Sequence, residues 1–396
     1  MARKARMWYT YFIDFDGLPM SFFSKTESYL GVDIGAHGIK LVELRKTKSR
    51  PQLWTYGILD QTLDIHLPER SDKSPEDLLA KKGILLDKKK DAANTELNRV
   101  YGERVDKYAE LLRALLKEVK TTTTNVTASL PVSYIFQAVL TMPRVEDKEI
   151  GKIVAAEVAK MLSRPAEEMQ VVHQKIPEIE PGKDKVLRIL VTAAPRTLVE
   201  FYTLIFQKAG LRLQELETEA FALERSLVGH DKATAMIVDI GAERTNFFII
   251  DQGLPLTHRS ISAGGFMIDR ILAQELGIEP DLVRKIKYDL AKIREKVNSA
   301  VFEPFLNLLV KEIAYSFDLF LHQTGNEAKK PEKIILTGGS CVFPFIAENI
   351  QKNFPMRVFI GDPWARTVYQ DGLRPILDGI GPRMAVCLGL AMRNII

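Results

Sequence analysis

The pentapeptide "VDIGA" occurs twice in this chain, at residues 32–36 and 238–242. Each copy follows one short apolar run and precedes another, "GIKLVEL" in the first case and "TNFFII" in the second. This pattern is typical of two strands joined by a tight glycine turn. The spacing between the copies is far longer than the ~20–50 residues of a solenoid repeat. It therefore predicts two related domains that each open with a strand–turn–strand hairpin.

Bulk composition narrows the class of protein. The 396 residues exceed one ordinary core, and contents of 46% apolar and 27% charged residues are typical of a folded globular chain. The net charge is only +4, with basic and acidic residues interleaved, which argues against a nucleic-acid partner. Both cysteines, Cys341 and Cys387, lie in apolar stretches, as expected in a reducing, cytoplasmic compartment.

The sequence predicts neither a membrane span nor a signal peptide. No run of about 18 apolar residues is present. The basic, aromatic beginning of the chain is interrupted by Asp14 and Asp16, which does not suit a signal peptide. We therefore expect residues 1–28 to be a disordered extension, and we favour Met20 over Met1 as the natural start.

Helical and strand patterns alternate in both halves, which predicts an α/β fold with mixed sheets. We expect strands at 30–33, 39–44, 53–59, 235–239 and 245–251, and helices at 281–297 and 303–322. Apolar residues of a further predicted helix recur at three- and four-residue spacing from 101 to 119. The last helix is expected to be entered through Pro382, a residue favoured in the first turn. Residues 66–98 read as a charged insertion.

The repeated Asp-Ile-Gly turn suits phosphate and Mg²⁺ chemistry. Glycine allows a sharp turn, and the N–H groups that follow can form a concavity for an anion. An aspartate at the strand end, Asp33 or Asp239, can hold Mg²⁺ through water. Asp-x-Gly also occurs in ordinary hairpins, so one copy is weak evidence, whereas two matching copies could grip one polyphosphate from both sides.

Two further glycine motifs stand between a strand and a helix. They are "SAGG" at 262–265 and "LTGGS" at 336–340. Glycine there lets the backbone approach a ligand closely, and the N-terminus of the following helix attracts anions. A plain strand-to-helix turn is the alternative for each motif taken alone. The order of the four motifs is more specific than any one of them.

This order resembles that of the actin-like ATPase superfamily over about residues 29–396. More closely, the chain resembles the PilM family of type IV pilus assembly proteins. The resemblance is carried by "YLGVDIGAHGIKLVEL", "VTASLPVSYIFQAVLTMP", "ILVTAAPRTLVEFYTLIFQKAGL", "IVDIGAERTNFFII", "ILTGGS", "DPWARTVY" and "GPRMAVCLGLAMR". It implies an actin-like domain I at 29–229, with a small inserted α+β subdomain at about 131–186. It also implies an actin-like domain II at 230–378 and a C-terminal helix, 379–396, that returns to domain I.

The resemblance also implies a site for ATP and Mg²⁺ between the two domains. The first phosphate hairpin would comprise Asp33, Gly35, Ala36, His37 and Gly38, and the second Asp239, Gly241 and Thr245. Gly264 and Gly265 would lie near the phosphates, and Gly338, Gly339, Ser340 and Arg284 near the nucleoside. Asp33 and Asp239 would hold Mg²⁺ through water. Arg284 can equally be a solvated helix charge, and His37 an exposed turn residue.

Glu219 falls where relatives place a glutamate that orients the attacking water in phosphoryl transfer. A helix-capping or surface glutamate is the alternative. Many relatives have hydroxyl residues after the first "DIG", whereas this chain has Ala36-His37-Gly38 and keeps a hydroxyl only at Thr245. We therefore expect the site to bind nucleotide better than it hydrolyses it.

The resemblance implies a cytoplasmic assembly protein that docks the N-terminal peptide of the membrane subunit PilN. The groove would be lined by apolar residues of "SLPVSYIFQAVL" and of the helix after Arg196. The sequence lacks the amphipathic C-terminal tail of FtsA, so recruitment to the membrane would occur through the partner, without direct insertion. Homo-oligomerisation stays open. The alternatives are a filament-forming protein like FtsA or MreB, and a sugar-kinase-like phosphotransferase, for which no sugar motif is evident.

Overall fold

The structure, a computed structural model, describes residues 8–9, 27–66, 89–162, 164–176, 186–279, 282–283, 297–323 and 325–395. Its strands are β1 (Trp8–Tyr9), β2 (Ser28–Gly35), β3 (Gly38–Arg45), β4 (Gln52–Leu59), β5 (Asn125–Leu130), β6 (Phe136–Pro143), β7 (Met169–Lys175), β8 (Val186–Pro195), β9 (Arg212–Thr218), β10 (Ala235–Ile240), β11 (Thr245–Asp251), β12 (Leu254–Ile261), β13 (Lys333–Thr337) and β14 (Arg357–Ile360). Its principal helices are α2 (Lys89–Glu118), α3 (Asp147–Met161), α4 (Arg196–Lys208), α5 (Glu219–Leu223), α6 (Gly265–Leu276), α9 (Glu303–Leu321), α10 (Ile346–Asn353) and α11 (Arg374–Met392).

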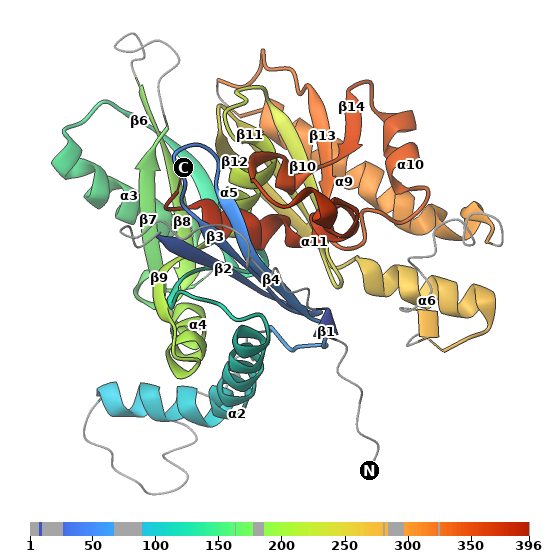
Figure 1. Cartoon of the computed structure of the whole chain (residues 1–396). Helices are drawn as coiled ribbons and strands as arrows, with labels where there is room; N and C mark the ends of the chain where they lie inside the picture. The colour runs from blue at the N-terminus through green and yellow to red at the C-terminus, as the bar shows by residue number, and fades with distance from the viewer. Residues whose placement is uncertain are drawn as a thin grey trace, which may run out of the picture.

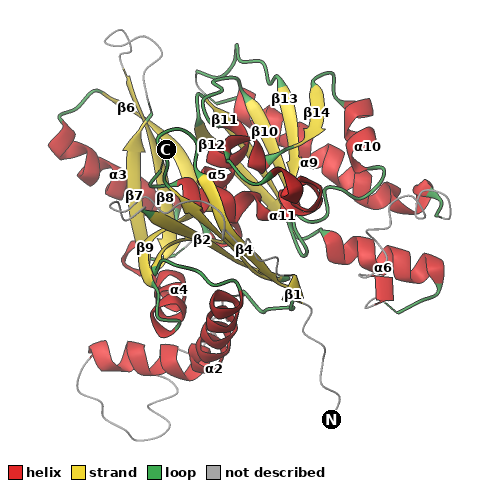
Figure 2. Cartoon of the chain, in the orientation of Figure 1, coloured by secondary structure: helices red, strands yellow, loops and turns green. Residues whose placement is uncertain are grey.

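Two sheets repeat one topology. The first has the order β1-β4-β3-β2-β5-β9 and the second β12-β11-β10-β13-β14. In each, a three-stranded antiparallel unit (β2–β3–β4 or β10–β11–β12) is followed by two parallel strands. Both "VDIGA" copies lie on the first strand of their unit, and the two sheets lie side by side with α11 between them (Figures 1 and 2). The α/β fold with mixed sheets is confirmed.

Helices cover each sheet with the faces that the sequence pattern predicts. The apolar residues at helical spacing are buried: Val105, Tyr108, Leu112 and Leu115 on α2, and Val119 directly after its end. They share a core with α4 and the strands of the first sheet. In the second half, α9 matches the helix expected at 303–322 and buries Phe305, Leu309 and Ile313 against the second sheet. Amphipathic packing of this kind contributes most of the stability of such helices.

A third sheet, of order β6-β8-β7, forms the inserted subdomain together with α3. Its last strand, β8, runs to Pro195, so the expected boundary at Val186 falls nine residues short. On α3, Ile150, Val154 and Val158 are buried as expected. Met161, predicted on the same face, is 49% exposed because the helix ends there.

The last helix begins earlier than predicted. It begins at Arg374, with Pro375 in its first turn, and Pro382 lies inside it. Pro375 therefore has the first-turn role that we assigned to Pro382. The carbonyl of Pro382 accepts hydrogen bonds from the Gly338 N–H at 3.0 Å and the Thr337 hydroxyl at 3.1 Å. These contacts tie the end of β13 to α11 at the position of the proline.

Helix α11 fills the space between the two sheets. One side of it joins a core with Val42, Leu53 and Trp364, and the other a core with Leu223 and Ile237. A Cβ added at Gly31 of β2 would overlap the Cys387 carbonyl, and one at Gly389 would overlap the Ala222 carbonyl. The helical segment 371–392 is long and apolar enough to cross a membrane. However, 67% of its most apolar 18 residues are buried inside the protein, as expected for a core helix.

Three predictions concern segments that the structure describes only in part. Trp8–Tyr9 form β1 and pair with β4, which departs from the disorder expected throughout residues 1–28. Most of the charged insertion, 66–98, lies outside the described residues, although the backbone of its end already belongs to α2. The predicted helix at 281–297, with Arg284, also lies almost wholly outside them.

Candidate functional site

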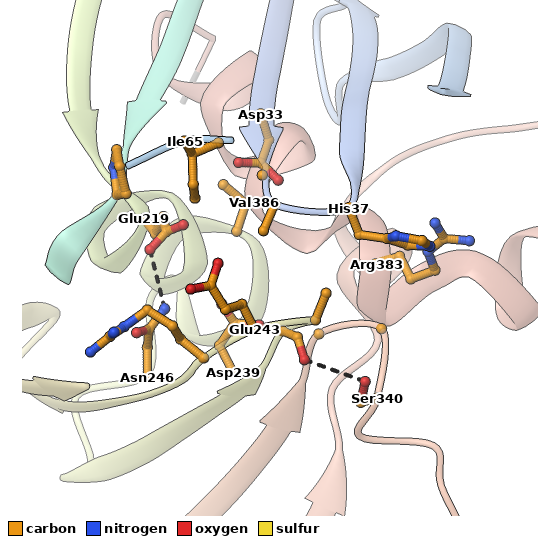
Figure 3. A pocket seen from close by; sticks show the side chains of 18 of the residues that line it. Asp33, His37, Ile65, Glu219, Asp239, Glu243, Asn246, Ser340, Arg383 and Val386 are labelled. Atoms are coloured by element: carbon orange, nitrogen blue, oxygen red, sulfur yellow. Dashed lines mark hydrogen bonds between the residues drawn. The ribbon is translucent and has the colours of Figure 1, made fainter. Parts of the chain in front are cut away.

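The two "VDIGA" hairpins face one another across a cavity of about 140 Å³. Its lining includes ten predicted site residues: Asp33, Gly35, Ala36, His37, Glu219, Asp239, Gly241, Gly338, Gly339 and Ser340. Figure 3 shows the side chains of Asp33, Glu219 and Asp239 directed into the same space from different elements. The fold therefore brings together motifs as far apart in sequence as residues 32–36 and 336–340.

The first hairpin places a lysine directly opposite its aspartate. Asp33 on β2 pairs with Lys40 on β3 across a two-residue turn, Ala36-His37. Lys40 Nζ lies 2.7 Å from Asp33 Oδ2, and the Ser129 hydroxyl donates to Asp33 Oδ1 at 2.8 Å. Burial acts to lower the pKa of Lys40, but the Asp33 charge and the hydrogen bond to Asp33 together more than offset it, so that the pKa is raised. Lys40 is therefore a cation at neutral pH.

The second hairpin repeats this register with an uncharged partner. Asp239 on β10 pairs with Asn246 on β11, seven residues later, as Asp33 pairs with Lys40. Burial raises the pKa of Asp239 to about 6, with a further contribution from the Asp33 charge, while Lys40 and Asn246 oppose the change. The charge on Asp239 is consequently much less compensated than that on Asp33.

Glu219 stands at the start of α5, between the two hairpins. Its Oε2 accepts a hydrogen bond from Asn246 Nδ2 at 3.3 Å and lies 3.5 Å from the Val132 N–H. Asn246 is itself held by the Ser260 hydroxyl, which donates to Asn246 Oδ1 at 2.7 Å. Burial, followed by the charges of Asp239 and Asp33, holds the pKa of Glu219 well above its usual range.

Three converging carboxylates with one lysine form a site that attracts a further cation. After burial, the Asp33 charge raises the pKa of Asp239, and the charges of Asp239 and Asp33 raise that of Glu219; a divalent ion would oppose both shifts. Among the described residues, however, no three His, Cys, Asp or Glu side chains are close enough to hold a metal directly. Carboxylate oxygens are ligands of the kind that Mg²⁺ uses in proteins, where it commonly keeps several of its own water molecules.

The glycines of the other two motifs allow their loops to pack against the second hairpin. A Cβ at Gly264 would lie 2.7 Å from the Gly241 carbonyl oxygen. At Gly338, whose φ of +85° is left-handed, a Cβ would overlap Asp239 Oδ1. Ser340 lies beside them, and its N–H donates to the Ile240 carbonyl at 3.0 Å. "SAGG" and "LTGGS" thus surround the end of the strand that carries Asp239.

Some predicted residues lie behind the lining. Thr245 is fully buried, and its hydroxyl donates to the Ala263 carbonyl at 2.7 Å. Contrary to our prediction, its side chain therefore does not face the cavity. Asn246 is the residue that lies opposite Asp239. Thr245 immediately precedes Asn246 on β11, so its side chain projects from the opposite face of the strand. Gly38, Gly264 and Gly265 shape the loops without lining the cavity. Arg284 lies outside the described residues.

Sequence reasoning missed several polar residues of the lining. They are Lys40, Glu243, Arg244, Asn246 and Arg383. The Arg383 guanidinium pairs with Asp60, and its aliphatic part packs against Gly339. Lys40 and Asn246 could have been found from the turn length alone. A two-residue turn at Ala36-His37 fixes residue 40 opposite residue 33.

Comparison with known proteins agrees with this geometry. A family model described as "Type IV pilus assembly protein PilM" matches residues 95–395, about three quarters of the sequence. The chain belongs to the PilM family. Its structure is similar to that of a PilM–PilN type IV pilus biogenesis complex, with a TM-score of 0.71 and 21% identity, over 93% of this chain and 98% of that one.

A second solved structure extends the fold relationship beyond the PilM family. The ethanolamine utilization protein EutJ from Carboxydothermus hydrogenoformans matches with a TM-score of 0.51 and 15% identity, over 92% of this chain and 89% of that one. At such low identity the similarity concerns the fold alone. This member of the PilM family therefore has the actin-like ATPase fold, and it is an actin-like protein of type IV pilus assembly.

Proposed function

We propose that this chain binds Mg-ATP between its two hairpins and docks the N-terminal cytoplasmic peptide of a PilN-like membrane subunit. The observation that carries the nucleotide part is the identical register of Asp33 and Asp239 at one cavity. Backbone N–H groups beside two glycine turns and one partly buried cation, Lys40, suit a polyphosphate chain.

Individual residues have distinct roles in this proposal. Lys40 Nζ donates to phosphate oxygens, and the carboxylates of Asp33 and Asp239 hold the water shell of Mg²⁺. Mg²⁺ neutralises phosphate charge when it is bound. Glu219 is the residue that accepts a hydrogen bond from an attacking water. Its raised pKa and the absence of hydroxyls in Ala36-His37-Gly38 both favour binding over rapid hydrolysis.

Calorimetric titration with Mg-ATP tests the nucleotide proposal. We expect Lys40→Met and Asp239→Asn each to weaken binding about tenfold or more, because each removes a charge-assisted contact. The control is Lys208→Met, which breaks the surface pair of Lys208 with Asp106 away from the cavity. If the unmodified chain does not bind Mg-ATP, or if both cavity variants bind it as tightly as the unmodified chain does, the cavity is not a nucleotide site.

The partner part of the proposal is supported by family membership and by the PilM–PilN similarity. The residues that we propose to contact the peptide are Phe136 and Leu140 of β6, in the third sheet, and Val199 of α4; all three are apolar and only partly buried. A protein that docks a membrane subunit in this way is held at the cytoplasmic face of the membrane without inserting into it.

A fluorescently labelled N-terminal peptide of a PilN-like subunit tests this docking by anisotropy, with and without Mg-ATP. Leu140→Ser and Val199→Ser should each weaken binding about five- to tenfold, the effect of losing one apolar anchor. Leu319→Ser, an exposed apolar position on α9 in domain II, is the matched control. If no peptide binds in either nucleotide state, the partner assignment is wrong.

A further inference from the structure

One contact joins the two halves of the protein at the edge of the cavity. His66 belongs to the segment that follows β4 of the first sheet, and Glu243 to the turn between β10 and β11 of the second. His66 Nε2 lies 2.8 Å from Glu243 Oε1. Glu243 lines the cavity, and both residues line a surface pocket that adjoins it. The contact therefore crosses between the halves that the nucleotide would have to separate.

His66 is held in position from its own half. The Tyr134 hydroxyl lies 3.0 Å from His66 Nδ1, and Arg104 Nη1 donates to the His66 carbonyl oxygen at 2.7 Å. Arg104 also lies 3.2 Å from the Asp64 carboxylate. In a neutral ring these contacts assign Nε2–H as the donor to Glu243 and Nδ1 as the acceptor from Tyr134. Tyr134 belongs to a short 3-10 turn, Val132–Tyr134, that leads into β6 of the inserted subdomain.

A second contact crosses between the halves beside the first. The His37 ring, in the turn of the first hairpin, meets Phe266 of α6 edge to face, with ring centroids 5.9 Å apart. With both contacts formed, the cavity has a volume of about 140 Å³. Both contacts stand at the edge of this cavity, and both would break if the two hairpins moved apart.

We infer that His66, Glu243 and Tyr134 form a latch that holds the nucleotide cleft closed and links its opening to the root of the inserted subdomain. This inference rests on the proposed function, because it concerns the same cleft. A latch lowers the population of the open, binding-competent state, and it must break before nucleotide enters. The side chains of His66 and Glu243 are 48% and 33% exposed. An ion pair of that exposure changes the equilibrium constant between the closed and open states by about two- to fivefold.

The first test measures the association rate of an ATP analogue with a methylanthraniloyl fluorophore by stopped flow. His66→Ala, Glu243→Gln and Tyr134→Phe should each accelerate association by about two- to fivefold. The double variant His66→Ala/Glu243→Gln should be no faster than the faster single variant, because both remove one contact. Lys208→Ala, which removes an ion pair of similar exposure on the surface, should leave the rate unchanged. Unchanged rates in all three latch variants would overturn the inference.

The second test needs no nucleotide, so it separates this inference from the proposed function. Hydrogen–deuterium exchange is followed at two hydrogen-bonded segments, Val132–Ile135 and Gly241–Arg244. His66→Ala should accelerate exchange in both segments, although neither contains the substituted residue. If exchange in Gly241–Arg244 stays at its original rate, there is no latch, whatever the nucleotide affinity. If exchange accelerates while the unmodified chain and the variants all fail to bind the analogue, the latch stands and the nucleotide proposal fails.

Discussion

Asp33 and Asp239 occupy the same register position in two hairpins but face different partners. Asp33 lies opposite Lys40, which neutralises it at 2.7 Å, whereas Asp239 lies opposite the uncharged Asn246. The first carboxylate is therefore compensated within the protein, and the second is compensated only in part. This asymmetry makes the Asp239 side of the cavity the one that gains most from an added cation.

We predict that Lys40→Met destabilises the protein as well as weakening nucleotide binding. The substitution leaves Asp33 buried with only Ser129 as a described partner, and breaking a buried ion pair costs about 3 kcal/mol. Urea unfolding monitored by circular dichroism measures this loss. The double variant Asp33→Asn/Lys40→Met, which removes both charges, should recover most of the stability while binding stays weak. A double variant as unstable as Lys40→Met would contradict this account.

Stability should fall as pH rises through the acid range because of Asp239. Burial and the Asp33 charge raise its pKa to about 6 from an ordinary value of 3.8, so the folded state holds this proton more tightly than the unfolded state. The folded state therefore loses stability between about pH 4 and pH 6, by on the order of 1–3 kcal/mol. The raised pKa of Glu219 acts in the same direction.

Asp239→Asn tests this pH dependence. The free energy of unfolding should rise at pH 7.5 and change little at pH 4.5, where the aspartate is already protonated in the folded state. Urea titrations of both proteins at a series of pH values provide the comparison. A difference between the two proteins that is the same at every pH would exclude the carboxylate as its source.

Gly338→Ala should be far more costly than Gly210→Ala, although both glycines have left-handed backbones, with φ of +85° and +81°. An alanine at either position bears about 1–2 kcal/mol of backbone strain. A Cβ at Gly210 meets nothing within 4 Å, whereas one at Gly338 overlaps Asp239 and lies 2.5 Å from the Ile240 carbonyl. We therefore expect a further ~1–3 kcal/mol of destabilisation at Gly338. Equal melting temperatures for the two variants would contradict the close packing.

Two glycines of α11 offer an opposed pair of predictions. Gly379→Ala should stabilise the protein by about 0.5–1 kcal/mol, because its Cβ meets nothing within 4 Å and alanine favours a helix. Gly389→Ala should destabilise it by about 1–3 kcal/mol, because the added methyl overlaps the Ala222 backbone. Calorimetric melting of both variants checks the signs, and stabilisation by both would show that α11 is not tightly packed there.

The sequence predicted central strands better than edge strands. The hairpins at Asp33 and Asp239 were evident because their strands are buried on both faces and their turns contain glycine. Five strands were missed, β1, β7, β9, β12 and β14, and each lies at the edge of its sheet. The residues of the last four are mostly partly or fully exposed, so the apolar pattern that marks a strand is weak there.

Site residues could be predicted where a local sequence pattern determines the direction in which a side chain points. Asp33 and Asp239 were found because a repeated motif carries them, whereas Thr245 was assigned to the second phosphate hairpin from the family resemblance, without regard to strand alternation. Its neighbour Asn246 occupies the face toward the cavity. Arg383 reaches the cavity only through the packing of α11, and no spacing in the sequence encodes that arrangement, whereas Glu219 of α5 was predicted from the family resemblance alone.

The position of α11 has a consequence for how this chain is made. Both sheets precede it in sequence, yet residues of α11 complete one core with the first sheet and another with the second. Domains generally fold in the order in which the ribosome releases them. Here neither half has its full core until the final helix emerges and is inserted between them. Partly synthesised chains should therefore expose apolar surface on both halves until α11 has left the ribosome.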